Sequence, residues 1–304
     1  MHKPVMLREV LETLAPHDNE TYIDATFGVG GYSRAILEQA KCSVVALDRD
    51  PEAQEHAGLL KDQYQDRFSF YQGRFGKMGQ LVPVMGYDGI VFDLGVSSPQ
   101  LDEGERGFSF KTEGPLDMRM ERTGLSAADI VNSFEEKEIS RILWVYGEER
   151  RSRAIARALV EKRKDQPFTT TTQLANVARA IVGFERPGFD SATRTFQALR
   201  LFVNDELGEL ERGLEASEKL LKAGGRLVVV SFHSLEDRIV KNFLKERSVN
   251  LPHASRHSPE ISQPRATFQL MSRKALLPQE DEIKTNFRSR SARLRWAIRN
   301  KEGA

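Results

Sequence analysis

The sequence predicts an α/β fold in which a parallel sheet of seven strands is interrupted by an all-helical insertion. Short β-rich runs alternate with helical stretches over the first third of the chain, which is the pattern of βαβ units. Repeats of helical period then follow without a strand, and strand patterns return towards the C-terminus. The last two strand patterns indicate a hairpin-like edge. These three observations are typical of a doubly wound sheet with a second domain.

The first four strands are predicted at Tyr22–Thr26, Ser43–Asp48, Phe68–Gln72 and Gly89–Leu94. The clearest helix between them is Pro51–Tyr64. Continuous apolar runs in the second and fourth strands fit burial on both faces of the sheet. Helices are therefore expected on both sides.

The helical insertion is clearest between about Ser126 and Val182, where no strand pattern occurs. Ser126 and Asp129 have capping-box spacing, and apolar residues from Ile139 to Tyr146 repeat at helical intervals. A second repeat runs up to Ile181, with Gly183 as its C-cap. We assign 106–204 to a helical domain for substrate recognition, and 1–105 with 205–304 to the sheet domain.

Sheet character returns after a long helix that is predicted to end near Gly224. The strand Arg226–Phe232 leads into the helix Leu235–Arg247. Two further strands, Ala266–Arg273 and Ala292–Ile298, are predicted with a loop between them. The polar, proline-containing stretch 249–264 is predicted to be a surface loop.

Composition and charge exclude several classes of protein. The chain has 304 residues, of which 39% are hydrophobic, so it can bury a large core. Its single Cys42 excludes an internal disulfide and a cysteine-based zinc cluster. No apolar stretch is long enough to cross a membrane, and the N-terminus lacks the pattern of a signal peptide. We therefore expect a cytoplasmic protein.

Arginines gather in two places although the formal net charge is only +1. Such clusters suit an enzyme that binds nucleic acid on one face, but they are also normal on solvated helices. One cluster lies in the helical insertion and the other near the C-terminus: Arg150, Arg151, Arg153 and Arg157, then Arg288, Arg290, Arg293, Arg295 and Arg299.

A glycine-rich turn joins the first strand to the next helix, with Gly28, Gly30 and Gly31 following Asp24. Glycines at this place let the backbone approach a ligand at the helix N-terminus. A dinucleotide fingerprint requires glycine where this chain has Ser33, which disfavours an NAD-dependent oxidoreductase. An acidic strand end before a Gly-rich turn is closer to a methyltransferase, although many such turns serve only packing.

Two further strand ends carry acidic residues. Asp48 ends the second strand, where a carboxylate can accept hydrogen bonds from both ribose hydroxyls of a nucleoside cofactor. Its neighbour Asp50 precedes Pro51 and is expected to cap a helix. Asp93 ends the fourth strand at the ligand edge of the sheet. The Ser-Ser-Pro-Gln stretch 97–100 differs from the Pro-Pro-aromatic motif of many amine methyltransferases.

Taken together, these junctions resemble the bacterial RsmH (MraW) methyltransferase family along effectively the whole chain. The resemblance implies a class I (Rossmann-like) methyltransferase sheet with S-adenosylmethionine as cofactor. It further implies methylation of N4 of a cytidine at position 1402, in the decoding centre of 16S rRNA. The motifs that carry it are Ile23 to Gly31, Asp93 to Asp102, Glu105 to Phe110, Gly114 to Met120, Tyr146 to Arg150, Thr193 to Ala198, Ser231 to Arg238 and Arg288 to Ser291.

The resemblance also implies a set of cofactor contacts and shows two departures. Tyr32 stands where the family commonly has His, and Phe287 replaces a usual Pro. The first departure bears on the methionine end of the cofactor, whereas the second is expected to be local. The implied contacts are Gly30, Gly31, Tyr32, Asp48, Phe75, Asp93 and Gln100, to which the turn itself adds Gly28.

An acceptor near the target amine would take up the charge that develops on nitrogen during transfer. Asp93 or the backbone at Ser97 and Ser98 are the candidates for this catalytic role. The helical insertion and the C-terminal arginines form the expected RNA surface, because the target base must be unpaired or flipped to react. The candidate RNA contacts are Arg194, Arg200, Arg288, Arg290 and His233, each of which has a structural alternative such as a salt bridge.

The expected partner is 16S rRNA, with a folded 30S particle favoured over naked RNA by resemblance alone. His253 and His257 lack a clear third ligand, so no metal site is expected. A non-catalytic, RNA-binding ribosome-assembly factor with a retained cofactor pocket is the alternative from another class. The sequence leaves the oligomeric state open, a homodimer included.

Overall fold

The computed structural model describes residues 4–84, 86–184, 187–248 and 266–301. The chain divides into two compact units, Met1–Gly95 with Leu207–Ala304, and Val96–Glu206. The first boundary therefore lies before Val96 and not at 105/106 as predicted, because Val96 and Leu101 pack against the core of the helical unit. The predicted loop 249–264, with His253 and His257, lies outside the described residues.

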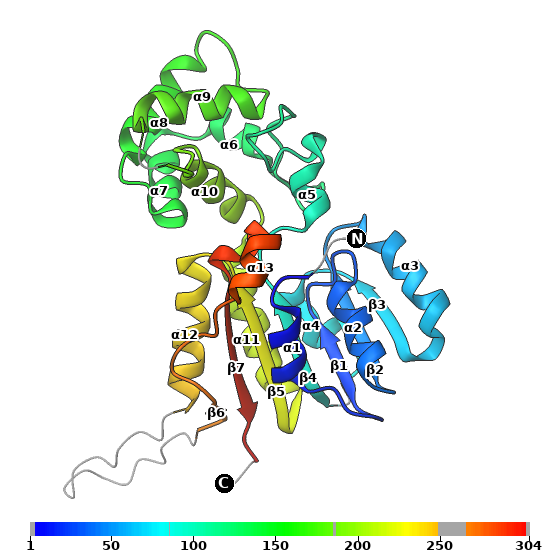
Figure 1. Cartoon of the computed structure of the whole chain (residues 1–304). Helices are drawn as coiled ribbons and strands as arrows, with labels where there is room; N and C mark the ends of the chain where they lie inside the picture. Colours follow the sequence, from blue (N-terminus) through cyan, green and yellow to red (C-terminus); the bar gives the residue numbers. More distant parts are fainter. Residues whose placement is uncertain (1–3, 85, 185–186, 249–265, 302–304) are drawn as a thin grey trace, which may run out of the picture. The chain divides into compact units, whose positions relative to one another are not determined.

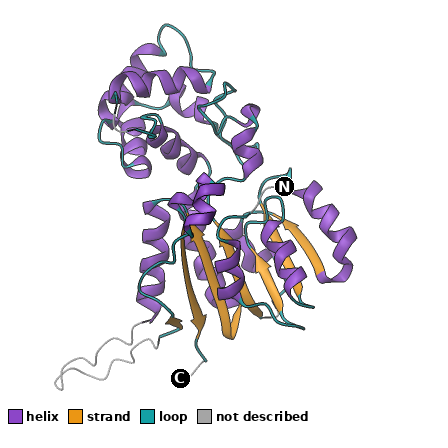
Figure 2. Ribbon diagram, viewed as in Figure 1, coloured by secondary structure: helices purple, strands orange, loops and turns teal. Residues whose placement is uncertain are grey.

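The first unit is built on one seven-stranded sheet (Figures 1 and 2), with the order β3-β2-β1-β4-β5-β7-β6. β1 to β5 are parallel, and β7 runs antiparallel to both of its neighbours. The strand order reverses between β1 and β4, which is where open α/β sheets bind ligands. The strands are β1 (Thr21–Asp24), β2 (Ser43–Asp48), β3 (Phe68–Gln72), β4 (Tyr87–Asp93), β5 (Leu221–Ser231), β6 (Phe268–Leu270) and β7 (Arg293–Arg299).

Helices cover both faces of this sheet, as the buried strands require. Side chains alternate along β2, so that Val44 and Ala46 pack on one side while Val45 and Leu47 pack on the other. The first face carries α1 (Leu7–Leu14), α2 (Gly31–Gln39) and α3 (Ala53–Tyr64), and the second carries α4 (Met78–Leu81), α11 (Glu206–Leu220) and α12 (Ser234–Ser248). The connections hold η1 (Gln65–Arg67), η2 (Phe75–Lys77), α13 (Glu280–Thr285) and η4 (Phe287–Ser291).

The second unit is all-helical and has its own core. The capping box predicted at Ser126 and Asp129 is present, and Gly183 ends α9 with a φ of 73°. α7 and α10 cross closely at Gly147, where a Cβ atom would lie 2.6 Å from the carbonyl oxygen of Arg194. The elements are α5 (Ser98–Asp102), η3 (Gly104–Arg106), α6 (Ala127–Ser133), α7 (Glu136–Gly147), α8 (Ser152–Lys162), α9 (Thr171–Val182) and α10 (Thr193–Val203).

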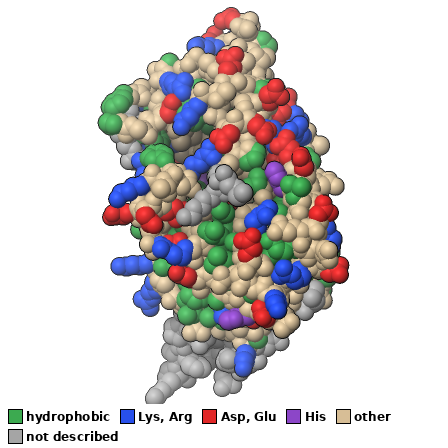
Figure 3. Space-filling view, turned by 45° about the vertical axis from the view of Figure 1, so that its right-hand side comes forward, with side chains coloured by type: hydrophobic (Ala, Val, Ile, Leu, Met, Phe, Trp, Pro, Cys, Tyr) green, Lys and Arg blue, Asp and Glu red, His purple; other side chains and the backbone are tan. Residues whose placement is uncertain are grey.

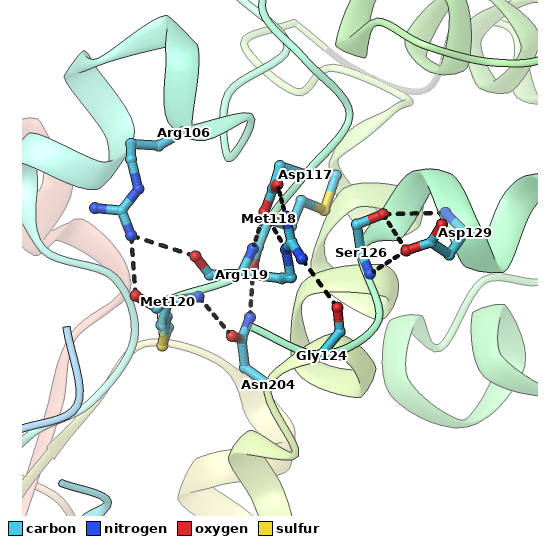
Figure 4. A network of polar contacts seen from close by, with 9 residues as sticks. All are labelled: Arg106, Asp117, Met118, Arg119, Met120, Gly124, Ser126, Asp129 and Asn204. Carbon is cyan, nitrogen blue, oxygen red and sulfur yellow. Dashed lines mark hydrogen bonds and ion pairs between the residues drawn. The ribbon is translucent and has the colours of Figure 1, made fainter. Parts of the chain in front are cut away.

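Side chains hold the long irregular loop between η3 and α6 (Figure 4). The buried Arg106 donates to the carbonyl of Met120 at 3.1 Å. Asn204 accepts from the backbone N–H of Met120 at 2.9 Å and donates to the carbonyl of Met118 at 2.7 Å. These bonds satisfy backbone groups that no helix or strand pairs. The loop is thereby tied to the end of α10.

The four N-terminal strands and the hairpin-like edge were predicted correctly, but three details near the C-terminus were not. β6 is shorter than the predicted strand Ala266–Arg273, and α11 ends at Leu220 and not near Gly224. The segment before β7 contains α13 where a loop was predicted. No helix in the described part of the chain is long and apolar enough to span a membrane. Basic and acidic side chains are interspersed on the face shown in Figure 3, in keeping with the small net charge.

Candidate active site

Three acidic residues end neighbouring parallel strands of the sheet: Asp24 on β1, Asp48 on β2 and Asp93 on β4. The register pairs Asp24 with Ala46 of β2 and with Val91 of β4, so these strands end at the same edge. This is the carboxyl edge, where an open α/β sheet binds its ligand. The candidate site of the first unit is therefore built on three carboxylates.

Asp24 stabilises the glycine-rich turn through hydrogen bonds. Its Oδ2 atom accepts from the backbone N–H of Ser33 at 3.2 Å and from the Ser33 hydroxyl at 2.7 Å, while Oδ1 accepts from the N–H of Thr26. Ser33, which disfavoured a dinucleotide fingerprint, thus ties the turn to β1. Burial raises the pKa of Asp24 to about 6, although the hydrogen bonds from Ser33 lower it.

The turn itself requires its glycines. Gly30 has a φ of +81°, and a Cβ atom there would lie 2.8 Å from the Phe27 ring. A Cβ atom on Gly31 would lie 2.4 Å from Cγ of Pro4. Gly31 also begins α2, and an α-helix leaves the N–H groups of its first turn without helical acceptors. The two glycines therefore allow close packing against Phe27 and Pro4, and the N-terminus of α2 that follows them can bind a ligand.

Asp48 receives two backbone hydrogen bonds that orient its carboxylate. Oδ2 accepts from Gly28 N–H at 2.7 Å, and Oδ1 accepts from Asp50 N–H at 2.8 Å. Burial raises the pKa of Asp48 to about 6, with the two N–H groups lowering it. Each carboxylate oxygen can accept more than one hydrogen bond, so Asp48 keeps capacity for a ligand.

Asp93 is the member of the trio with an unsatisfied atom. Its backbone N–H donates to the Thr26 hydroxyl at 2.6 Å. Its Oδ1 atom is buried and has no hydrogen-bond partner among the described residues. Burial, with repulsion from Asp24, raises the pKa of Asp93 well above its usual value. A buried acceptor without a partner is unusual and indicates a place where a ligand binds. Phe75 lies behind this strand end, with its ring 5.4 Å from that of Phe92.

An N-terminal segment packs over the turn, which the sequence did not indicate. Pro4 contacts Gly31, and the buried Tyr32 donates its hydroxyl to the carbonyl of Val5. The N–H of Met6 donates to Oε1 of Glu282 in α13 at 2.8 Å. Residues 6 and 282 are far apart in the sequence, so no local pattern could indicate this contact. The Tyr32 hydroxyl is therefore engaged with the protein's own backbone.

His233 follows β5 at the same edge and contacts Glu236. Its Nδ1 atom accepts from the Glu236 N–H at 3.4 Å, and Nε2 lies 3.1 Å from Oε1 of Glu236 without the alignment of a hydrogen bond. The Glu236 carboxylate also accepts from the N–H of Phe232 at 2.8 Å. Glu236 thus orders the turn after β5. This role of Glu236 was not predicted from the sequence.

The predicted residues 97 to 100 belong to the helical unit. Ser97 caps α5, and its N–H donates to Oε1 of the buried Gln100 at 3.0 Å. The Ser97 carbonyl accepts the N–H of Leu101, and Ser98 is the first residue of the helix. Helix bonds therefore already engage this backbone, so of the two proposed acceptors we favour Asp93. The cofactor contact of Gln100 stays a prediction.

The predicted RNA-contacting arginines differ in their surroundings. Arg200 forms a two-pronged ion pair with Glu206, at 2.8 and 3.0 Å, and its side chain is only 17% exposed. This favours its structural alternative. Arg194 lies over the Phe189 ring at 5.2 Å. Arg288 and Arg290 are exposed on η4. Their contacts with RNA stay predictions.

The first unit has the features of a class I methyltransferase: this strand order, a Gly-rich turn after β1, and carboxylates at the ends of β2 and β4. The chain belongs to the MraW methylase family, whose model matches residues 1–300. It is a methyltransferase that uses S-adenosylmethionine. The oriented Asp48, the close-approach turn and the unsatisfied Oδ1 atom of Asp93 fit a cofactor with ribose hydroxyls and positive charge.

Two relatives are both named ribosomal RNA small subunit methyltransferase H. The protein of Rhodospirillum rubrum is 54% identical, covering 97% of this chain and 93% of the relative. That of Paramagnetospirillum magneticum is 55% identical, covering 98% and 95%. A provisionally assigned methyltransferase of Streptococcus mutans, solved with SAH, is 13% identical over 98% of this chain and 99% of its own, with a TM-score of 0.46. At that TM-score the likeness says nothing about function.

Two other features of the described residues bear on chemistry. No cluster of three or more His, Cys, Asp or Glu that could hold a metal ion is found among them. Cys42 is buried, and burial raises the pKa of its thiol to about 11. A thiol with this pKa is an inert core residue and not a nucleophile at neutral pH.

The predicted ribose contact of Asp48 implies that cofactor affinity falls at low pH, because the carboxyl group must be ionised to accept two hydroxyl hydrogen bonds. Below pH 6 we expect the affinity for S-adenosylhomocysteine to drop about tenfold per pH unit. The stability of the free protein changes in the opposite sense. The raised pKa of Asp24 and Asp48 contributes stability that is present below about pH 4 and is lost as pH rises through 6.

Calorimetric titration between pH 5 and 7.5 measures this affinity, and thermal unfolding of the free protein measures the stability. The variant Asp48→Asn removes one titrating group and should flatten the pH dependence of binding. An affinity that stays constant from pH 7.5 to 5 would contradict the assignment of Asp48.

Proposed function

We propose that this enzyme methylates N4 of a cytidine in the decoding centre of 16S rRNA, at position 1402, with S-adenosylmethionine as donor. One observation carries the proposal: 54% and 55% identity over nearly the whole chain to two proteins named ribosomal RNA small subunit methyltransferase H. The 30S particle is the proposed form of the substrate. A reaction on that particle takes place in the cytoplasm.

The chain's own residues would hold the cofactor from three strand ends. Asp48 accepts the ribose hydroxyls, because its two oxygens are already oriented by backbone N–H groups. The backbone of Gly28, Gly30 and Gly31 lines the turn and takes the polar end of the cofactor. The remaining proposed contacts are Tyr32, Phe75, Asp93 and Gln100.

S-adenosylmethionine supplies a methyl carbon made electrophilic by the positively charged sulfur that carries it. The N4 amine of cytosine is a weak nucleophile, because its lone pair is delocalised into the ring. The enzyme therefore contributes mainly alignment and exclusion of water, which can supply about 7–11 kcal/mol. Asp93 accepts a hydrogen bond from the amine through Oδ1 and offsets the charge that develops on nitrogen. Burial and neighbouring carboxylates raise the pKa of Asp93, and the positively charged sulfur of the bound cofactor would favour its ionised form.

The target base must leave its stack to reach Asp93, so the enzyme needs contacts that hold the flanking RNA. Arg194 in the helical unit and Arg288 and Arg290 in the first unit are the proposed phosphate contacts. His233 is the proposed contact to the base or its ribose, because it follows β5 at the carboxyl edge.

The test is methyl transfer from labelled S-adenosylmethionine to 30S subunits that lack the modification, followed by nucleoside analysis. We expect label in N4-methylcytidine at one site. Label on another base would support S-adenosylmethionine as the methyl donor but contradict N4 of the cytidine as the methylated atom. No transfer despite measured cofactor and RNA binding would favour a non-catalytic assembly factor. Deproteinised 16S rRNA is the matched substrate control, and we expect it to be methylated more slowly.

A further inference from the structure

An exposed aromatic ring stands on η4, beside the proposed phosphate contacts. Phe287 is 66% exposed, although most large apolar side chains of this unit are buried. The guanidinium carbon of Arg290 lies 4.5 Å from the centre of the Phe287 ring. This cation–π contact holds the ring against a charged group and leaves it accessible. A single exposed apolar side chain is common on protein surfaces, so the residues around Phe287 decide whether it can bind a ligand.

Short-range hydrogen bonds and a buried serine hold the backbone beside the ring. Ser289, two residues on, is fully buried, and its hydroxyl and N–H both donate to the carbonyl of Asn286, at 2.8 and 2.9 Å. The N–H of Ala292 donates in turn to the carbonyl of Ser289 at 2.8 Å. η4 is thus anchored from below. Phe287 is the first residue of this hydrogen-bonded 3-10 turn.

The ring also lies at the functional edge of the sheet. β7 begins at Arg293, which pairs with Ser231 at the carboxyl end of β5. Glu282 of α13, just before η4, bonds to Met6 and is close enough to raise the pKa of Asp93. In Figure 1, α13 lies at the same end of the sheet, where β5 ends. A ligand on Phe287 would therefore lie on the side of the unit that carries Asp93.

The charge of this segment is positive. Residues 283–293 contain Lys284, Arg288, Arg290 and Arg293 and no Asp or Glu, and these four side chains are exposed. Arg293 pairs with Asp237 at 3.1 Å, and the first turn of α13 is acidic. The excess positive charge is thus centred on η4. A flat ring among cations is the combination with which proteins bind unpaired bases and their phosphates.

We propose that Phe287 is a stacking platform for one unpaired base of the RNA beside the target nucleotide. Arg290 supports the ring in addition to its proposed phosphate contact, and Arg288 contacts phosphate. This rests on the proposed function, because it names the RNA feature that the same edge binds. A peptide or a second copy of the chain would use the ring as apolar surface, which leucine also offers. Phe287→Leu separates these occupants, because leucine keeps apolar bulk but cannot stack.

The experiment measures binding of a fluorescent single-stranded RNA of about 12 nucleotides, spanning the target cytidine, to the enzyme saturated with S-adenosylhomocysteine. We expect Phe287→Ala and Phe287→Leu each to weaken binding roughly tenfold and Phe287→Trp to retain it. Leu59→Ala is the matched control, because Leu59 is a 61% exposed apolar residue on α3. It should bind RNA as the unchanged protein does.

A second readout reports stacking itself. 2-Aminopurine is placed at successive positions of the same RNA, and its fluorescence should change at one position with the unchanged protein and with Phe287→Trp. That change should be absent with Phe287→Leu. Circular dichroism verifies that each variant is folded. If Phe287→Ala does not fold, Phe287→Leu alone tests the proposal.

Unchanged RNA affinity in folded Phe287→Leu overturns the platform, even if the enzyme methylates 30S subunits. Loss with Ala but not with Leu also overturns it and indicates an apolar contact. The proposed function is tested separately by the 30S assay. If RNA binding depends on Phe287 but no N4-methylcytidine forms in that assay, the proposed reaction is contradicted while the stacking role of Phe287 is supported.

Discussion

Asp93→Ala is expected to lower the turnover of methyl transfer by about 100-fold to 1000-fold. The reason is that Oδ1 of Asp93 is buried without a partner among the described residues, on a strand whose end is held by the bond from its N–H to Thr26. Such an acceptor needs no reorganisation when charge develops on the amine. Single-turnover kinetics with saturating cofactor and 30S subunits measure the effect.

Two controls make the role of Asp93 specific. Asp93→Asn keeps the shape and the backbone bond to Thr26 but lacks negative charge, so its turnover should be nearly as low. Calorimetry of S-adenosylhomocysteine binding separates a loss of chemistry from a loss of cofactor. Ser126→Ala removes the cap of α6, which costs about 1 kcal/mol of stability, and should leave the chemical step unchanged. Normal turnover in Asp93→Ala would exclude Asp93 as the acceptor.

The second large effect is expected on cofactor affinity. Asp48→Ala should weaken S-adenosylhomocysteine binding by about 100-fold or more, which is ~3 kcal/mol. Two charge-assisted hydrogen bonds to the ribose would be lost. The N–H of Gly28 would also lose its acceptor, so the glycine-rich turn would be held less firmly. Calorimetric titration at pH 7.5 measures the change.

Asp50→Ala is the matched control for Asp48. Oδ1 of Asp50 accepts from the N–H of Glu52 at 3.1 Å, before α3 begins at Ala53. Its removal should cost about 1 kcal/mol of stability and change the affinity far less than Asp48→Ala does. If Asp48→Ala binds the cofactor within about threefold of the unchanged protein, the ribose contact is wrong.

Local patterns in the sequence were sufficient for most elements of the fold. β2 and β3 were predicted with the bounds that the structure has, because apolar and β-branched runs flanked by turns are local signals. The capping box at Ser126 and the C-cap at Gly183 were predicted for the same reason. Asp50 was expected to cap a helix from Pro51, but α3 begins two residues later, after a turn that Asp50 itself closes.

Predictions failed where distant segments decide the structure. α13 was missed because its residues have no long apolar repeat, and Glu282 bonds to Met6 at the other end of the chain. The unit boundary at Gly95 depends on Val96 and Leu101 joining the helical core. The phosphate contact of Arg200 stays a prediction, although its ion pair with Glu206, six residues along the chain, favours a structural role. Arg200 and Arg290 are the same residue type and differ in their surroundings: Arg200 is paired and mostly buried, whereas Arg290 is exposed.

The sequence by itself determined the alternation of strands and helices, the helical insertion and the acidic ends of β1, β2 and β4, because each is a local pattern of spacing and polarity. Only the tertiary structure decided which polar groups are satisfied. Asp24 is engaged by Ser33 and Tyr32 by Val5, while Oδ1 of Asp93 has no partner among the described residues. Whether a polar group has a hydrogen-bond partner depends on contacts between strand ends, turns and a terminal segment, which only folding brings together. Burial in the folded protein then shifts the pKa of each carboxyl group.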